Sequence, residues 1–573
     1  MSKVNEAIER GYRILEALEE NCRNASGVST DLLMELIRDN KETEFGRSHG
    51  FSSIRTREDY KRSVPFSAYD DYADAVERMT RGEKDILTSY PVIFYALTTG
   101  SVGVSKKIPV SEQAMKMYAD YGAGLHQAVY DRYLKDRTGE GYESKKSIFL
   151  PVAAESETWD GTPVSNFSGR VYISQKDALI RKMAGPPECL YDCGQMDYLY
   201  LKAFYGLKER EVSFIGSAFT AAIYDFFAYI EKNWTSLCDD IAKGRLNPEK
   251  EIPGEVRERL NQALKPDPVR ARELAAVFEE GFDRPVVSRI WKHFAYLNGI
   301  GSGSFAVYTK MMRRFTGDIP FSFSLLCASE GLFATTIQME SLDYVLIPDA
   351  GYIEFVPEEE MDLPEEVLRT RTLECDQLET GKNYEMIITN LSGFYRYRIG
   401  DVVRVNGYEG SSPRLCFHYR KSQVLNVAGE KTSEDLIQYA VDALSCRRNL
   451  QIMGWSVCED HSISPGRYIL FLETDPVIRT EDRGLCRNIL EEELAYASDF
   501  YRNYIRDGHL SPMKIACLQP QTYQLYRELM IYKGASPNQL KPVHIIDNSF
   551  KMGFFSALTA EREAEGEAGF EHE

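Results

Sequence analysis

Several features that would assign this chain to a large class of proteins are missing from its sequence. Its 11 cysteines contain no Cys-x2-Cys or Cys/His ligand spacing, and the closest pair is Cys189 and Cys193. Zinc sites and disulfide frameworks depend on such spacings, so neither is expected. An odd number of cysteines in a large chain fits reduced thiols in a cytosol.

Long apolar runs and an excess of positive charge are missing as well. No stretch of about eighteen apolar residues occurs, which argues against a transmembrane helix. The N-terminal segment carries charges every few residues and predicts an amphipathic helix, not a signal peptide. The formal net charge of −19 disfavours binding to nucleic acid or to an anionic membrane surface. We therefore expect a soluble, cytoplasmic protein.

What is present is an ordinary globular composition, 43% apolar and 27% charged, in 573 residues. This is too long for one compact core, so two or more domains are expected. Strand-like runs at 147–154, 170–174 and 212–217 alternate with helical ones, which is typical of an α/β sheet protein. From residue 320 the strands follow one another more closely and predict a mixed or barrel-like sheet.

The two ends of the chain differ from this α/β pattern. Helices are expected at 5–22 and 29–40, the second capped by Ser29 or Thr30. After residue 420 the pattern resets to a small α+β unit. We expect a large domain at 1–418, a hinge at 419–422, a small domain at 423–555 and an acidic, disordered tail at 556–573.

The chain is organised around a loop rich in hydroxyls and glycines, which follows an apolar run at 92–97. Its backbone N–H groups could turn inward onto a polyphosphate, and its glycines let the chain approach a ligand closely. A Gly-rich hairpin with polar decoration is an equally plausible interpretation of the loop alone. A helix is expected directly after it, from Ser111 to about Leu134. The candidate residues of the loop are Thr98, Thr99, Gly100, Ser101, Gly103 and the trailing cation Lys106.

Carboxylates follow strand-like runs at two later places. Ser329 and Glu330 come after an apolar strand and suit a phosphate oxygen and Mg²⁺, although a polar strand exit explains them too. Asp401 could accept hydrogen bonds from two ribose hydroxyls. Alternatively, it forms a structural salt-bridge cluster with Arg396 and Arg398.

Two lysines of the predicted small domain complete the candidate set. Lys431 stands in GEKTSE and Lys541 in GASPNQLKP. Either could be a solvated surface charge, but a lysine on a mobile domain could also reach a phosphate.

Together these segments resemble the acyl acid amido synthetases, which include the plant enzymes that conjugate auxin, jasmonate or benzoates to amino acids. The resemblance covers essentially 1–545 in order, through these segments: NKETEFGRSHGF, VPFSAYDDYADAVERMTRGEKDILT, TTGSVGVSKKIPVS, ASEG, YIEFVP, GFYRYRIGDVVRV, GEKTSE and GASPNQLK. It implies the firefly luciferase-like, acyl-adenylate-forming architecture: a large N-terminal α/β domain with a barrel-like sheet, and a small mobile α+β domain.

The resemblance also implies roles for the candidate residues. The loop 98–103 and Lys106 match the family's phosphate loop, Ser329 and Glu330 its Ser-Glu motif, and Asp401 its ribose-binding aspartate. Lys431 and Lys541 match two lysines that approach the nucleotide. Leu326 stands where the family usually has Tyr, so an aromatic contact to adenine is lost, and Val102 removes one hydroxyl from the loop.

The implied activity is an ATP- and Mg²⁺-dependent ligase that activates a carboxylic acid as its acyl-adenylate and transfers it to an amino acid or another amine. An acyl-CoA ligase and a non-catalytic protein that binds nucleotide or acid are the alternatives. No carrier-protein domain is expected to follow the small domain.

Overall fold

The computed structural model forms two compact units, residues 1–417 and 418–573, which are described separately. Described residues are 3–97, 106–150, 155–165, 167–190, 196–301, 306–361, 363–420, 424–425, 427, 432–463, 465–506, 510–533, 540–546 and 549–560. None of the described helices is both long and apolar enough to cross a membrane.

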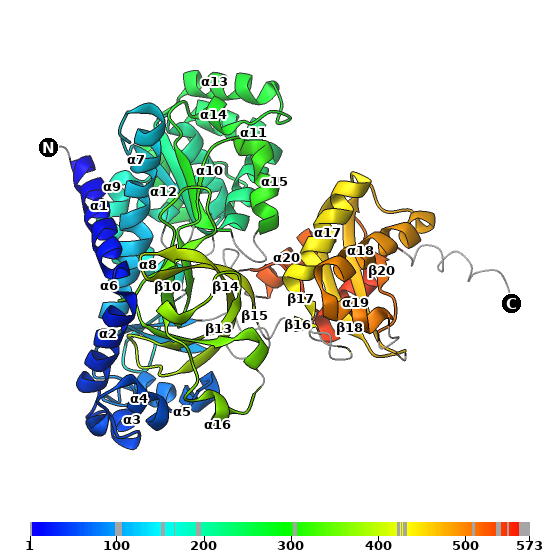
Figure 1. The fold of residues 1–573 in the computed structure, drawn as a ribbon. Coiled ribbons are helices and arrows are strands. Elements are labelled where there is room, and N and C mark those ends of the chain that lie inside the picture. The colour runs from blue at the N-terminus through cyan, green and yellow to red at the C-terminus, as the bar shows by residue number, and fades with distance from the viewer. Residues whose placement is uncertain are drawn as a thin grey trace. The chain divides into compact units, whose positions relative to one another are not determined.

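A parallel sheet forms one half of the large unit (Figure 1). Its strand order is β3-β6-β7-β8, and each neighbouring pair is parallel. The strands are β3 (Lys146–Phe149), β6 (Val212–Phe219), β7 (Tyr296–Ile300) and β8 (Phe321–Ser322). The surrounding helices are α9 (Lys176–Lys182), α10 (Tyr198–Lys208), α11 (Thr220–Lys243), α12 (Gly254–Ala263), α13 (Pro268–Glu279), α14 (Val287–Ile290) and α15 (Ala306–Thr316). This is the α/β arrangement that the alternating pattern predicts.

A second, four-stranded sheet carries the segment that precedes the phosphate-loop candidate. Its order is β2-β1-β5-β4. The strands are β1 (Val92–Leu97), β2 (Lys107–Ser111), β4 (Glu155–Glu157) and β5 (Pro163–Ser165). Strands β1 and β2 are antiparallel, and Leu97 pairs with Lys107.

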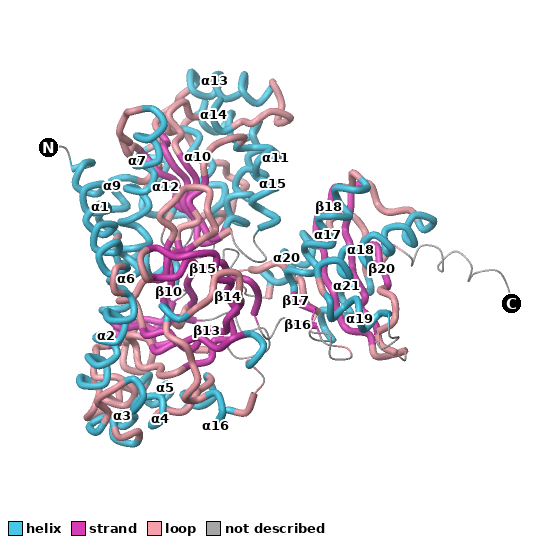
Figure 2. The backbone as a smooth tube through the Cα atoms, viewed as in Figure 1, coloured by secondary structure: helices cyan, strands magenta, loops and turns pink. Residues whose placement is uncertain are grey.

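The other half of the large unit is a seven-stranded sheet, ordered β12-β13-β14-β15-β11-β10-β9 (Figure 2). Its strands are β9 (Leu325–Ala328), β10 (Gly331–Thr335), β11 (Tyr344–Leu346), β12 (Tyr352–Pro357), β13 (Asn383–Thr389), β14 (Tyr397–Glu409) and β15 (Ser412–Arg420). The closely spaced strands expected after residue 320 therefore assemble into one sheet. Helix α16 (Glu365–Leu368) lies between β12 and β13 in the chain.

Helices from the N-terminus pack along this unit: α1 (Lys3–Cys22), α2 (Ala25–Asp39), α3 (Glu44–Ser48), α4 (Arg57–Ser63) and α5 (Tyr69–Thr80). The predicted cap of the second helix is wrong. Helix α2 begins at Ala25, and Ser29 and Thr30 lie inside it. The start is fixed by a distant residue, because Ser411 Oγ accepts a hydrogen bond from the Ala25 N–H at 2.9 Å.

The helix expected from Ser111 is interrupted. It consists of α6 (Glu112–Tyr118), a π-helical turn η2 (Ala119–Gly124) and α7 (Leu125–Thr138). Ser111 caps α6, as its side chain accepts a hydrogen bond from Ala114 N. π-Turns inside helices frequently mark functional sites.

The strand expected at 170–174 is wrong, because these residues belong to helix α8 (Phe167–Ser174). The run of Val, Tyr and Ile favours a strand locally, but tertiary packing overrides such preferences. The Phe167 ring at the start of α8 packs against Tyr118, with ring centroids 4.1 Å apart.

The small unit is a three-stranded sheet covered on both faces. The strands, in the order β18-β19-β20, are β18 (Gln451–Asp460), β19 (Arg467–Asp475) and β20 (Lys514–Cys517). Successive residues of β19 point to opposite faces of the sheet and so belong to different hydrophobic cores. Leu470 and Leu472 pack with α17 and α18, and Phe471 packs with α20 and α21. The helices are α17 (Glu434–Arg448), α18 (Arg483–Ala497), α19 (Asp499–Arg506), α20 (Thr522–Tyr532) and α21 (Ser549–Ala557).

Both ends of the small unit bear on the predicted boundaries. A short pair of strands, β16 (Val424–Leu425) and β17 (Thr432–Ser433), precedes α17. Residues 421 and 422 of the predicted hinge, and residue 423 after it, lie outside the described residues. At the other end, residues placed in the predicted tail are ordered, since Ala560 N donates to Cys517 O at 2.8 Å. Residues 561–573 lie outside the described residues.

Candidate active site

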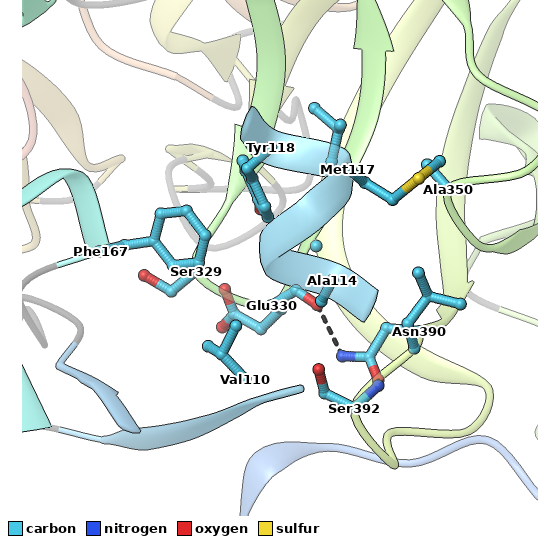
Figure 3. Close-up of a pocket in the computed structure, with 13 residues that line it drawn as sticks. Val110, Ala114, Met117, Tyr118, Phe167, Ser329, Glu330, Ala350, Asn390 and Ser392 are labelled. Carbon is cyan, nitrogen blue, oxygen red and sulfur yellow. Dashed lines mark hydrogen bonds between the residues drawn. The ribbon is translucent and has the colours of Figure 1, made fainter. Parts of the chain in front are cut away.

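Ser329 and Glu330 form the turn between β9 and β10, and they border a small pocket in the large unit (Figure 3). Both residues are half-buried. The carboxylate of Glu330 points away from Asn390 and toward the side where Ser329 and Phe167 lie. The sequence predicts a carboxylate at the end of a strand, and in the structure this residue borders a pocket.

Two side chains from other elements hold this turn in place. Tyr118 of α6 donates its hydroxyl hydrogen to Ala328 O at 2.6 Å. Asn390, directly after β13, donates from Nδ2 to Glu330 O at 2.6 Å. Both bonds go to backbone carbonyls, so they position the turn through its main chain.

The loop after β13 is itself fixed. Asn390 Oδ1 accepts hydrogen bonds from Ser392 N and Phe394 N, each at 2.9 Å. Ser392 Oγ accepts from Ser111 N at 3.0 Å, and Ser111 Oγ donates to Leu391 O at 2.7 Å. The residue that caps α6 is thereby tied to the loop that holds Glu330.

The rest of the pocket wall is mostly apolar. Val110, Met117 and Phe167 contribute to it, beside the ring of Tyr118. In Figure 3 Phe167 and Val110 lie on the same side as Ser329 and the Glu330 carboxylate, whereas the Met117 side chain extends toward Ala350. An apolar wall that meets a carboxylate-bearing turn can hold a ligand with one apolar and one charged end.

The negative charge of Glu330 contributes to the raised pKa values of tyrosines on two helices. Burial raises the pKa of Tyr118 well above its ordinary value, and the negative charge of Glu330 adds to the shift. The pKa of Tyr69 is also raised, mainly by burial, with Glu330 again among the causes. Lys106 Nζ lies 5.1 Å from the centroid of the Tyr69 ring. The lysine predicted to follow the phosphate loop thus lies beside a tyrosine whose pKa the charge of Glu330 also affects.

The loop itself, with Thr98, Thr99, Gly100, Ser101 and Gly103, lies outside the described residues. Its two ends are defined, because β1 and β2 pair up to Leu97 and Lys107. Its role in binding phosphate stays a prediction.

Asp401 is 5% exposed and lies in an irregular part of β14. Arg398 pairs with Ile387 and Val402 with Glu385, so three residues of β14 face one residue of β13. Gly400 takes a φ of +79° there, which glycine adopts without strain. Bulges of this kind are common next to active sites, where they redirect a side chain.

The arginines beside Asp401 serve the fold. Arg396 is fully buried and binds both carboxylate oxygens of Glu354 at 2.9 Å. Arg398 forms an ion pair with Glu385 at 2.5 Å. These ion pairs join the two arginines to Glu354 and Glu385, and the alternative of a salt-bridge cluster with Asp401 stays a prediction.

The remaining candidates are distributed over both units. Leu326, which stands in place of the usual tyrosine, is buried in the large core. Lys541 is exposed in the small unit, and Lys431 lies outside the described residues. No distance between these lysines and Glu330 is defined, because the two units are not placed relative to one another.

Tyr118, Phe167 and Asn390 are among the pocket residues that the sequence did not single out as site residues. Asn390 carried a usable signal, since it is a polar residue at the end of an apolar strand, as Ser329 is. Phe167 carried none, because it was not expected in a helix.

Comparison with known proteins gives matches along nearly the whole chain. The GH3 family N-terminal domain matches residues 14–321, the central domain 344–420 and the C-terminal domain 435–549. Indole-3-acetic acid-amido synthetase GH3.3 of Arabidopsis thaliana is 26% identical, over 93% of this chain and 91% of its own length. Indole-3-acetic acid-amido synthetase GH3.8 of Oryza sativa subsp. indica is 27% identical, over 92% and 89%.

A solved structure agrees on the fold. The GH3.15 acyl acid amido synthetase superimposes with a TM-score of 0.80 at 23% identity, covering 95% of both chains. A likeness of this size over the whole chain shows that the two proteins share their architecture. The order of the three domain matches and the shared fold lead to one conclusion: the chain belongs to the GH3 family, the family of the acyl acid amido synthetases.

Proposed function

We propose that this protein is an AMP-forming ligase that joins a small carboxylic acid to an amino acid or another amine. In the first step an oxygen of the acid attacks the α-phosphorus of ATP, pyrophosphate leaves, and an acyl-adenylate is formed. In the second step the amine nitrogen attacks the acyl carbon, loses a proton, and AMP leaves. The observation that carries the proposal is the Ser329–Glu330 turn, fixed from two sides at a pocket with an apolar wall.

The chain's own residues would contribute mainly by alignment and electrostatics, which need no covalent nucleophile. The apolar wall would hold the acyl part of the acid beside the turn. Asp401, at the β14 bulge, would accept hydrogen bonds from the ribose hydroxyls. The loop 98–103 and Lys106 would bind the phosphates, and Lys431 and Lys541 would approach them from the small unit.

Magnesium is part of the proposal. Within the described residues, no three His, Cys, Asp or Glu side chains are grouped to hold a metal. Mg²⁺, however, is commonly bound by one or two carboxylates together with substrate phosphates and water. Glu330 would supply such a carboxylate, since it lies on the turn that borders the pocket. The ion would neutralise charge on the phosphates.

The test is pyrophosphate exchange into ATP, measured across a panel of carboxylic acids, followed by addition of amino acids or CoA. Glu330→Gln and Asp401→Asn should each lower acid-dependent exchange about tenfold to hundredfold, because a charge-assisted contact is worth roughly 1.5–3 kcal/mol. The exposed carboxylates Glu366 and Asp318 give matched controls, Glu366→Gln and Asp318→Asn, which should keep wild-type exchange.

The alternatives predict other outcomes. Thioester formation with CoA, without amide formation from any amino acid, would indicate an acyl-CoA ligase. Binding of ATP or acid with no exchange at all would indicate a non-catalytic binding protein. The cytoplasmic location stays a prediction from the sequence.

A further inference from the structure

A buried histidine–carboxylate pair lies in the small unit, outside the site described above. His544 Nδ1 is 2.7 Å from Glu434 Oε1, and the two residues are 5% and 7% exposed. A carboxylate can only accept, so Nδ1 donates this hydrogen bond. Glu434 is the first residue of α17, whereas His544 lies in the segment 540–546 near the end of the unit.

The pair connects the two segments that carry the candidate lysines. Lys431 stands three positions before Glu434, and Lys541 stands three positions before His544. The two segments are 110 positions apart in the chain, so only the fold brings them together. Thr432, next to Lys431, is also anchored, as its hydroxyl accepts from the Tyr468 hydroxyl at 2.9 Å.

His544 is held from the strand side as well. Its ring stacks on Trp455 of β18, with centroids 3.9 Å apart and planes 18° apart. The backbone of its segment bonds to the same strand: Val457 N donates to His544 O at 2.7 Å, and Ile546 N donates to Val457 O at 2.9 Å. Loss of the imidazole would therefore remove the link to α17 but leave the backbone bonds to β18.

We propose that the His544–Glu434 pair positions Lys541 for the proposed reaction, by fixing its segment against the start of α17. A short charge-assisted hydrogen bond between buried groups restricts the segment in a way that the backbone bonds to β18 alone do not. His544 acts here through Lys541 and is not itself expected to touch substrate. The inference rests on the proposed function, because it assigns Lys541 a role in one half-reaction.

The experiment compares two half-reactions: pyrophosphate exchange, and amide formation from a supplied acyl-adenylate. Lys541→Ala, His544→Leu and the double variant are measured together. His544→Leu should impair the same half-reaction as Lys541→Ala, by about tenfold, as expected for loss of a hydrogen bond to a charged group. The double variant should be no worse than Lys541→Ala alone, because residues that act as one unit are not additive.

Two further variants separate positioning from stability. His544→Gln keeps a donor for Glu434 and should restore most of the activity. If His544→Leu does not fold, Glu434→Leu, which removes the acceptor of the same hydrogen bond, replaces it in the cycle. The matched control is His461→Leu, which removes an exposed histidine paired with Glu459 at 3.1 Å in the same unit and should leave both half-reactions unchanged.

The outcomes are distinct. A wild-type protein without either half-reaction would refute the proposed function. If the wild-type protein catalyses both half-reactions, the inference is tested by the variants. It is refuted if His544→Leu is fully active or impairs both half-reactions equally. It is also refuted if the double variant is less active than Lys541→Ala by the full factor that His544→Leu causes alone.

Discussion

At the scale of the residue, His126 shows how burial controls a titratable group. It lies on α7 just after the π-turn, 8% exposed, and Nδ1 bonds to Gly122 O at 2.5 Å. The rings of Phe214 and Tyr296 pack edge-on against it, and the positive charge of Lys182 acts on it. Burial, with a smaller effect of Lys182, lowers the pKa of His126 to about 4.

This pKa predicts a loss of stability in acid. Below pH 6.5 an unfolded chain binds a proton at His126 that the folded chain does not bind until about pH 4. Stability should therefore fall as the pH drops through this window, by about 2 kcal/mol between pH 7 and pH 5 from His126 alone. The free energy of unfolding is measured by denaturant titration of the wild-type protein and His126→Gln at both pH values. Between pH 7 and pH 5 it should fall by about 2 kcal/mol less in the variant than in the wild type.

The exposed His293 gives the control, because His293→Gln should respond to acid as the wild type does. An unchanged acid response in His126→Gln would show that the histidine is protonated in the folded protein.

At the scale of the element, the β9–β10 turn depends on α6 for its position. The Tyr118 hydroxyl bonds to Ala328 O from a helix more than 200 positions away in the chain. Tyr118→Phe would leave that carbonyl without this donor, which costs roughly 1 kcal/mol. We expect pyrophosphate exchange to fall about threefold to tenfold.

The measurement is exchange under saturating ATP, together with the melting temperature. Tyr130→Phe is the matched control, since Tyr130 is a buried tyrosine of α7 that packs on Tyr296. Equal losses in the two variants would mean that a general loosening of the helix, and not the turn, limits activity.

Elements also show where local patterns fail. Helix α8 occupies a run that favours a strand, and α2 begins four positions before its expected cap. In both cases the deciding contact comes from elsewhere: Phe167 packs on Tyr118, and Ser411 bonds to the first N–H of α2.

At the scale of the whole molecule, the proposed reaction requires the two units to cooperate. Lys541 lies in the small unit, and Glu330 and the phosphate-loop candidate lie in the large one. The proposed reaction predicts that Lys541 acts on the phosphates of ATP bound to the large unit. Lys541→Ala should then impair acyl-adenylate formation much more than amide formation from a supplied acyl-adenylate.

Single-turnover measurement of each half-reaction tests this. Lys533→Ala removes another exposed lysine of the same unit and should affect neither step. Loss of the second step alone in Lys541→Ala would assign the lysine to amine capture, and loss of neither would make it a surface charge.

The family and the fold could be predicted from the sequence, and both are confirmed by the comparisons. Motifs such as the Ser-Glu pair are runs of neighbouring residues with fixed order, so one sequence is enough to find them. The alternating pattern of the large domain and the change after residue 320 likewise follow from consecutive residues.

The sequence by itself determined which residues carry charge and hydroxyls and which consecutive runs form most helices and strands. Only the tertiary structure decided that Tyr118 and Asn390 fix the Glu330 turn, that Arg396 pairs with Glu354, and that His544 meets Glu434. The physical reason is that local conformation depends on neighbours in the chain, whereas these contacts join residues between 42 and 210 positions apart. Such pairs form only because burial of a shared core brings their elements together.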